Sequence, residues 1–317
     1  MMESPESKRP GGWERELLER LAFSSLQEQK TRRRWGIFFK ILGFAYLTVL
    51  LVAVGTGSGT GSHTSERHTA LVDVRGVIEP EGEASAEAIN AALQEAFKEK
   101  NAAGVILRVN SPGGSPVQSS IVHDEIKRLR AKHPDKPLHV VVEDVCASGG
   151  YFIAAAADRI YVNRASIVGS IGVLMDGFGF TGSMDKLGVE RRLLTAGENK
   201  GFLDPFSPQD ERHRKHAQVL LNDIHQQFID VVKKGRGPRL KESPDLFSGL
   251  MWTGQQSIAL GLADEFGSVD SVARDVMKAE TVVDYTIRRS LADRLAKRFG
   301  SAMGDSVASA FRNFRLY

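Results

Sequence analysis

The stretch CASGG, at positions 146–150, places Ser148 between an apolar run and an alanine-rich run. The first run is typical of a strand and the second of a helix. A serine at such a junction is most often a helix cap, whose oxygen accepts a hydrogen bond from a helical amide. It can also be a nucleophile, because a sharp turn between small residues exposes its hydroxyl and the first helical amides face developing negative charge. By itself the pattern favours the cap.

A second glycine-rich loop, NSPGG at 110–114, follows the preceding apolar strand. Loops at the carboxyl ends of parallel strands converge, so we expect NSPGG and CASGG to be neighbours in space. The amides of Gly113 and Gly114 would then point, with that of Gly149, at the oxyanion that forms when a serine attacks a carbonyl. One such donor is worth about 2.7–4 kcal/mol in the transition state. The alternative is an ordinary Pro-Gly turn.

A serine nucleophile needs a base that takes its proton. The eight histidines lie in a polar tether, in polar turns, in helices or inside strands, so a Ser-His-Asp triad has no support in the sequence. A lysine can serve when burial among apolar groups lowers the pKa of its amine toward neutrality. Lys200 is the candidate, because it follows an apolar segment expected to be a strand (189–194), lies between two glycines and precedes Phe202. The competing interpretation is one more surface group among 42 basic residues.

Strand-like and helix-like patterns alternate after residue 68. We expect strands over 69–78, 104–109, 137–143 and 159–163, extended segments at 169–174 and 189–194, and helices over 85–99, 116–132, 151–157, 178–187 and 209–234. Ser115 followed by Pro116 predicts the N-cap and the first residue of the second helix. The β-α-β-α order predicts one α/β domain over 69–285, with a mostly parallel sheet and covering helices.

Composition and charge narrow the class of protein. The 317 residues are 42% hydrophobic and 26% charged, as in a globular protein. The net charge of +3 comes from basic ends around a mildly acidic body, which argues against a nucleic-acid-binding core. With one cysteine no intrachain disulfide can form, and no cysteine or histidine cluster has the spacing of a zinc site. We therefore expect neither a metal nor another cofactor.

Residues 37–54 are nearly all apolar and long enough to cross most of the hydrocarbon core of a bilayer. Three arginines at 32–34 precede them, and no lysine or arginine occurs over 56–65, so the positive-inside rule places the N-terminus in the cytosol. We expect one N-terminal transmembrane helix that serves as an uncleaved signal anchor. A cleavable signal peptide is the alternative, but the charged lead is long and no clean A-x-A site follows.

The expected organisation has five parts. They are a cytoplasmic basic lead (1–34), a transmembrane signal anchor (35–55), a flexible tether (56–68), the α/β domain (69–285) and a basic amphipathic tail (286–317). In the tail, Leu291, Leu295 and Phe299 share one helical face among basic residues. Such a segment can lie on anionic lipid, dock on a neighbouring subunit or fray in solvent, and the sequence leaves these open.

Five motifs in one order resemble those of the signal peptide peptidase A (SppA) family, which are membrane-anchored Ser–Lys peptidases related to the ClpP/crotonase fold. The motifs are NSPGG at 110–114, ASGGYFIAAAAD at 147–158, IVGSIGV at 167–173, AGENKGFLDPF at 196–206 and MWTGQQSIALGLADEFG at 251–267. Together they cover most of the expected domain. The resemblance therefore implies a short, single-domain member with a ClpP/crotonase-like α/β fold.

The resemblance implies a role for individual residues. Ser148 aligns with the family's nucleophile, Lys200 with its general base, and Ser170 with a serine that orients that lysine. The oxyanion region is occupied by Gly113, Gly114 and Gly149. Cys146 departs from the small residues, such as alanine, that are common at its position. We interpret it as a buried side chain and not as a second nucleophile, because nothing nearby would lower its pKa.

The resemblance also implies a setting. The family cleaves signal peptides left over from preprotein processing, and its short members form membrane-seated homo-oligomeric rings in which one subunit's lysine can complete the neighbour's site. The implied partners are peptide substrates, the lipid bilayer and further copies of the chain, with no nucleic acid. The implied location is the bacterial inner membrane, with the catalytic domain on the periplasmic side. Two other functions stay open, a crotonase-like acyl-thioester enzyme and a non-catalytic membrane scaffold of the same fold.

Overall fold

The computed structural model describes residues 33–49, 66–241 and 243–288. Nearly all of the expected basic lead, most of the tether and nearly all of the C-terminal tail lie outside these residues. The described residues from 66 to 288 belong to one compact unit.

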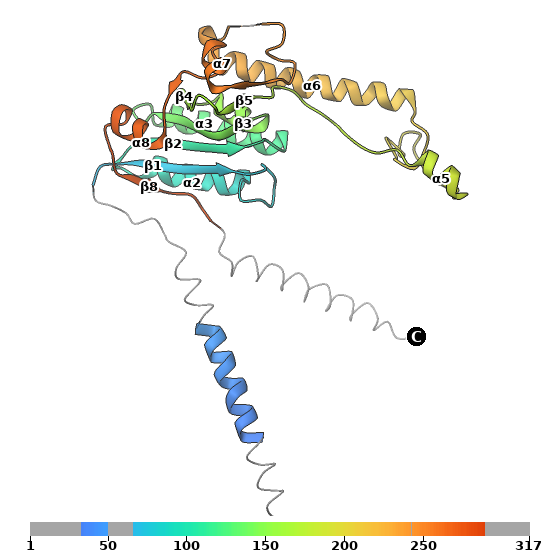
Figure 1. The fold of residues 1–317 in the computed structure, drawn as a ribbon, viewed down its shortest axis with the longest axis horizontal. Helices are drawn as coiled ribbons and strands as arrows, with labels where there is room; N and C mark the ends of the chain where they lie inside the picture. Colours follow the sequence, from blue (N-terminus) through green and yellow to red (C-terminus); the bar gives the residue numbers. More distant parts are fainter. Residues whose placement is uncertain (1–32, 50–65, 242, 289–317) are drawn as a thin grey trace, which may run out of the picture. The chain divides into compact units, whose positions relative to one another are not determined.

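The strands in the described part of the chain form one eight-stranded sheet with the order β6-β5-β3-β2-β1-β8, while β4 pairs with β3 and β7 with β4 (Figure 1). Every pairing is parallel except that of β5 with β6. The strands are β1 (His68–Arg75), β2 (Ala102–Ser111), β3 (Leu138–Ala147), β4 (Arg159–Val162), β5 (Ile167–Gly169), β6 (Met251–Thr253), β7 (Glu265–Phe266) and β8 (Val282–Asp284). The predicted mostly parallel α/β sheet is confirmed.

Helices connect these strands and cover the sheet. They are α2 (Ala86–Lys98), α3 (Pro116–Lys132), α4 (Gly149–Ala154), α5 (Thr181–Leu187), α6 (Glu211–Arg236), α7 (Gly254–Ala259) and α8 (Val269–Ser271), with a 3₁₀ turn η1 (Gly237–Arg239) and a π-helical turn η2 (Val272–Val276). The predicted cap of α3 is confirmed, because the Ser115 side chain accepts a hydrogen bond from the Gln118 amide and Pro116 opens the helix. The whole arrangement fits a ClpP/crotonase-like fold.

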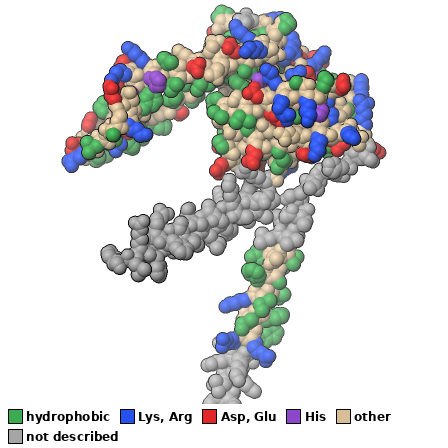
Figure 2. Space-filling model, turned by 180° about the vertical axis from the view of Figure 1, so that it is seen from behind, with side chains coloured by type: hydrophobic (Ala, Val, Ile, Leu, Met, Phe, Trp, Pro, Cys, Tyr) green, Lys and Arg blue, Asp and Glu red, His purple; other side chains and the backbone are tan. Residues whose placement is uncertain are grey.

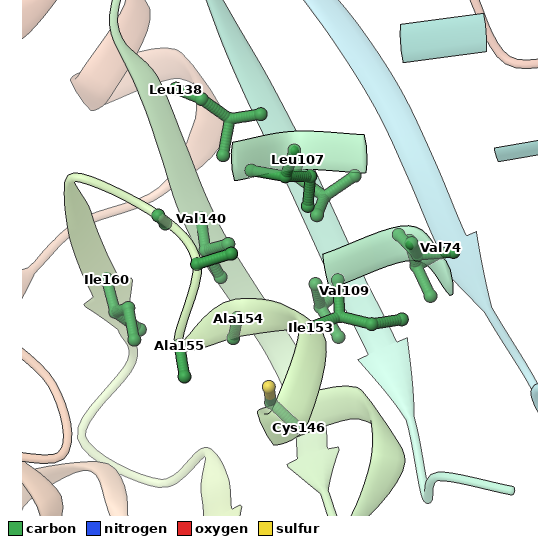
Figure 3. Close-up of a cluster of buried hydrophobic side chains, with 14 of the residues drawn as sticks. Val74, Leu107, Val109, Leu138, Val140, Cys146, Ile153, Ala154, Ala155 and Ile160 are labelled. Carbon is green, nitrogen blue, oxygen red and sulfur yellow. The ribbon is translucent and has the colours of Figure 1, made fainter. Parts of the chain in front are cut away.

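The central strands bury side chains on both faces of the sheet, as expected of parallel strands. In β3, Val140 belongs to a large apolar cluster that α2, α3 and α4 help to form, and Val141 belongs to a smaller cluster with Met277. Figure 3 shows part of the large cluster, where Val109 of β2 lies beside Ile153 of α4. Fully burying one such side chain stabilises the fold by about 1.5–3 kcal/mol. This packing makes β3 and α4 a firm base for the loop between them.

Strand β3, which leads to Ser148, changes partner along its length. Its first half pairs with β4 and its second half with β5. Between the halves the register of β3 against β2 shifts. Val109 pairs with Val142, and the next pair is Ser111 with Cys146, so two residues along β2 correspond to four residues along β3. A bulge of this kind bends the strand and redirects the chain beyond it, so that the Ser148 loop turns toward the end of β5.

Residues 173–210, which we call the arm, leave the sheet after β5 and lead into α6. Figure 1 shows α5 and the first turns of α6 beyond the edge of the sheet. The expected strand over 189–194 is wrong, since these residues form no strand and lie away from any strand that they could pair with. The helix expected over 178–187 is shorter and begins at Thr181. The arm therefore carries the Lys200 segment on irregular backbone.

The arm exposes apolar side chains to an unusual degree. Leu174, Phe178, Leu187 and Leu194 are each at least 78% exposed. Figure 2 shows hydrophobic side chains gathered along the arm. Between the arm and the first turns of α6 lies a hollow of about 750 Å³. Exposed apolar surface on this scale is typical of a surface that another molecule covers.

Residues 33–49 are helical. Among the described residues, no helix is both long and apolar enough to cross a membrane. The last residues of the expected anchor, 50–55, lie outside the part of the chain that the structure describes.

Candidate active site

Ser148 stands directly before α4 with a φ of 50° and a ψ of −123°. A non-glycine residue in this region costs of order 1–3 kcal/mol and persists only when its surroundings hold it. Its amide donates to the Gly169 carbonyl at 2.8 Å, and its carbonyl accepts from the Phe152 amide at 2.9 Å. Its hydroxyl makes no capping hydrogen bond. The cap interpretation of Ser148 is therefore wrong, and the strained turn is the kind that presents a nucleophile.

The NSPGG and CASGG loops are in contact, as the sequence predicts. Gly113 has a φ of 102°, and a Cβ on it would lie 2.7 Å from both the Gly149 amide nitrogen and the Ser148 Cβ. A Cβ on Gly149 would lie 2.4 Å from the Ser119 Oγ and 3.3 Å from the Gly114 amide nitrogen. Only glycine permits backbones to approach this closely. Both loops therefore need glycine for steric reasons.

The backbone bonds of these loops distinguish the three predicted oxyanion donors. The Gly113 amide donates to the Ser111 Oγ at 3.1 Å. Ile78 forms an isolated parallel β-bridge with Gly114. In this bridge the Ile78 amide donates to the Gly113 carbonyl and the Ser115 amide donates to the Ile78 carbonyl, so the bridge does not use the amide of Gly114. The amide of Gly149 is the first of α4, a position at which a helix supplies no internal acceptor. The geometry thus favours the amides of Gly114 and Gly149 as the donor pair.

Ser170 is the first residue after β5, just as Ser148 is the first residue after β3. The two strands pair with Ala147 opposite Gly169, so the two serines are the next residues along neighbouring parallel strands. Ser170 also has a positive φ, of 51°. Its amide donates to the Leu250 carbonyl at 2.8 Å. The structure therefore brings Ser148, Ser170 and the glycine loops to one edge of the sheet.

Lys200 lies in the arm and is exposed. Its amide donates to the Gly197 carbonyl at 3.1 Å. Its neighbours attach to the first turns of α6, since Glu198 pairs with Arg212 and the Asn199 Oδ1 lies 3.3 Å from the His213 Nε2. The segment around Lys200 is therefore fixed to the N-terminal end of α6.

The other half of α6 is the part that reaches the serines. The His225 Nε2 lies 3.1 Å from the Ile171 carbonyl oxygen, next to Ser170. Since an α-helix rises 1.5 Å per residue, His213 and His225 lie about 18 Å apart along the α6 axis. Within one chain, the structure does not bring Lys200 to Ser148.

Buried side chains around the site have structural roles that the sequence did not reveal. Ser111 donates from its Oγ to the Gly76 carbonyl at 2.6 Å while it accepts from the Gly113 amide. Ser119 is fully buried, and its Oγ donates to the Ser115 carbonyl at 3.0 Å. Both serines pack under the glycine loops. Nothing in their local sequence pattern marks them.

Cys146 is fully buried, and this burial raises the pKa of its thiol. That supports its interpretation as a packed side chain. Burial also lowers the pKa values of His123 and His139. In the described ranges, no group of three or more His, Cys, Asp or Glu side chains could hold a metal ion.

Comparison with known proteins agrees with this geometry. The model of peptidase family S49 matches residues 130–283. The chain is 30% identical over 231 residues to the putative signal peptide peptidase SppA of Enterococcus faecium, which covers 70% of this chain and 67% of that protein. It is 32% identical over 230 residues to the probable protease SohB of Haemophilus influenzae, which covers 72% of this chain and 62% of that protein.

A further similarity is to a protein of another name. The chain is 49% identical over 182 residues to the Na(+)/H(+) antiporter NhaA of Brucella melitensis biotype 1. That match covers 57% of this chain and only 25% of the antiporter protein, so the chain spans a quarter of its length. The protease relatives match over a larger share of both sequences. On this evidence the chain belongs to peptidase family S49.

Proposed function

We propose that this protein is a serine endopeptidase in which Ser148 is the nucleophile and the amides of Gly114 and Gly149 hold the oxyanion. The observation that carries the proposal is the Ser148 turn, whose φ is positive and whose hydroxyl does not cap the next helix. A strained turn that contributes nothing to helix capping is costly to keep unless it serves a function. The neighbouring glycine loops place the backbone amides of Gly114 and Gly149 beside that turn.

The reaction follows from the chemistry of these groups. The Ser148 Oγ attacks the scissile carbonyl carbon while its proton passes to the neutral amine of Lys200. The carbonyl oxygen becomes an oxyanion, which the two amides stabilise. The C–N bond then breaks, and the lysine ammonium returns the proton to the leaving amine. Water, deprotonated by the same amine, hydrolyses the acyl-serine and regenerates the hydroxyl.

The base is proposed to come from a second copy of the chain. Within one chain Lys200 is exposed. The Lys200 segment contacts the N-terminal turns of α6, whereas the part of α6 that lies near the serines is around His225. A lysine base must lose water contacts to be neutral near pH 7. A homo-oligomeric ring, in which the apolar arm of one subunit covers the serine site of the next, would supply that burial.

The proposed substrates are extended or unfolded hydrophobic peptides, and leftover signal peptides in particular. An extended peptide can pair with backbone at the edge of a sheet. The segment 35–55 is proposed to anchor the protein in the inner membrane, with residues 69–285 on the periplasmic side. After extraction of membranes with carbonate, the full chain should stay in the membrane pellet and a chain lacking residues 1–55 should not. Recovery of the full chain in the soluble fraction contradicts the anchor.

Substitution of the two central residues tests the catalytic proposal. Ser148→Ala removes the nucleophile and Lys200→Ala removes the base, so each should abolish hydrolysis of an unstructured peptide. Loss of a nucleophile typically lowers kcat by about 10⁶. Both variants should keep the thermal unfolding temperature of the unmodified protein. Turnover by either purified, folded variant overturns the assignment.

A further inference from the structure

Helix α6 contacts the serine site through a histidine that the proposed reaction does not use. The His225 Nε2 lies 3.1 Å from the carbonyl oxygen of Ile171. A carbonyl oxygen can only accept a hydrogen bond, so the Nε2 carries the proton and donates it. His225 therefore ties α6 to the backbone directly after Ser170.

The backbone that His225 holds is a strained turn. Ser170 has a φ of 51°, and the Gly172 amide donates back to the Ser170 carbonyl at 2.9 Å. Ile171, at the centre of this turn, is fully buried. The Ser170 amide is fixed on the other side by the Leu250 carbonyl at 2.8 Å. A conformation of this kind persists only when its surroundings over-determine it, and the His225 bond is one of those restraints.

A second contact fixes how α6 presents His225. Phe228, one turn further along α6, packs against Phe152 with ring centroids 5.2 Å apart. Residues three apart on a helix lie on one face, so His225 and Phe228 face the site together. Phe152 belongs to α4, and its amide donates to the Ser148 carbonyl at 2.9 Å. One face of α6 thus contacts the Ile171 backbone, next to Ser170, and the Phe152 ring of α4, the helix that begins after Ser148.

We propose that His225 is a positioning residue, which holds the turn of Ser170 so that the Ser170 and Ser148 hydroxyls keep the spacing that the incoming lysine requires. This rests on the proposed function. The bond joins His225 to a backbone carbonyl and not to a group that reacts in the proposed mechanism, so its loss should slow the proton-transfer step more than it weakens substrate binding. The expected signature is a lower kcat with a nearly unchanged KM.

The test uses variants that separate the donor from the bulk of the ring. His225→Phe keeps an aromatic ring and removes the donor, and we expect kcat to fall about tenfold, the scale of one lost hydrogen bond. His225→Gln places an amide N–H near the position of Nε2 and should recover most of that loss. KM for an unstructured peptide should stay within about twofold in both variants, as expected when only transition-state interactions change. The matched control is Gln226→Ala, an exposed neighbour on α6 that bonds only Asp230 among the described side chains.

The outcomes separate this proposal from the function on which it rests. Wild-type kcat in His225→Phe, together with an inactive Ser148→Ala variant, overturns the role of His225 and leaves the nucleophile in place. Equal losses in the Phe and Gln variants, accompanied by a lower unfolding temperature, show a structural role and also overturn it. An active Ser148→Ala variant overturns both proposals. If His225→Phe does not fold, His225→Met is the second donor-free variant, with the same expected loss.

Discussion

At the scale of single residues, Ser115 and Ser148 both occupy the N-cap position of a helix, but only the Ser115 side chain caps its helix. Ser115 has a φ of −60° and a ψ of 122°, and its side chain caps α3. Ser148 has a positive φ and leaves α4 uncapped. A capping side chain must point back at the amides of the first turn, which the extended backbone of Ser115 allows. The backbone of Ser148 instead turns its side chain away from that role.

The glycines beside Ser148 permit a prediction at the same scale. A Cβ on Gly149 would lie 2.4 Å from the Ser119 Oγ and close to the Gly114 amide. Gly149→Ala should therefore displace the donor pair and lower kcat by about 10²–10³, the cost of losing one oxyanion donor. Steady-state hydrolysis of an unstructured peptide measures this.

A second substitution and a control make the Gly149 prediction specific. The double variant Gly149→Ala with Ser119→Ala removes the clashing oxygen and should regain part of the lost activity. Gly36→Ala is the matched control, because a Cβ there meets nothing within 4 Å and Gly36 lies outside the arm and the glycine loops. A Gly149→Ala variant with full activity would contradict the placement of the oxyanion at this amide.

At the scale of elements, α6 connects the Lys200 segment to the serine site, so its attachment to the core matters. The Arg236 side chain at its C-terminal end is 1% exposed and bonds Asp264 through two nitrogens, at 2.9 and 2.8 Å. Burial alone would raise the pKa of Asp264. The hydrogen bonds and charge of Arg236 outweigh this effect, so that the pKa of Asp264 lies below its ordinary value of 3.8.

Removal of one partner of this pair should destabilise the fold. Asp264→Asn leaves Arg236 as an uncompensated buried charge, and the free energy of unfolding should fall by about 3–5 kcal/mol. Because the folded pKa is depressed, the contribution of Asp264 is complete above its unfolded pKa and is lost as pH falls through the folded one. The difference from the unmodified protein should thus be constant from about pH 5 to 7 and shrink below about pH 4. Urea unfolding measures it.

The control for the Asp264 prediction lies on α6 itself. Asp230→Asn changes an exposed carboxylate that accepts only from Gln226 among the described side chains. The free energy of unfolding should change by less than about 0.5 kcal/mol. A loss for Asp264→Asn no larger than this would mean that the ion pair does not anchor α6.

At the scale of the whole molecule, the separation of Lys200 from Ser148 leads to a prediction about mixed assemblies. Neither Ser148→Ala nor Lys200→Ala subunits should be active alone. If the lysine acts on the neighbouring subunit, co-assembly of the two variants in equal amounts restores about a quarter of the sites in a head-to-tail ring. Each restored site combines the serine of one variant with the lysine of the other. Peptide hydrolysis by co-expressed subunits measures it.

Each variant expressed and purified alone separates this mixed-assembly effect from trace contamination by unmodified protein. Contaminating unmodified chains would give the same low activity in the separate preparations as in the mixture, whereas activity restored by a neighbour's lysine should be present only when the two variants are assembled together. A mixed assembly that forms but stays inactive would place the base within each chain.

The local pattern of the sequence determined most of the elements. The helix expected over 85–99 is found at Ala86–Lys98, and the cap and first residue of the helix at Pro116 are as predicted. These features depend on periodicity and on one or two neighbouring residues, so they can be recognised without the rest of the chain. The convergence of the two glycine loops followed as well, because parallel strands end at one edge.

Other features depend on partners that are distant in the sequence. The segment at 189–194, VERRLL, is expected to be a strand, but a strand forms only where another strand pairs with it, and the arm has none there. The bulge in β3 arises because that strand serves β4 and β5 in turn. The same sequence that marked Ser148 and Lys200 as residues able to do chemistry contained no information on the distance between them. The tertiary structure decided that, because α6 is one continuous helix whose N-terminal end contacts the Lys200 segment, whereas His225 and Phe228, further along it, contact the serine site.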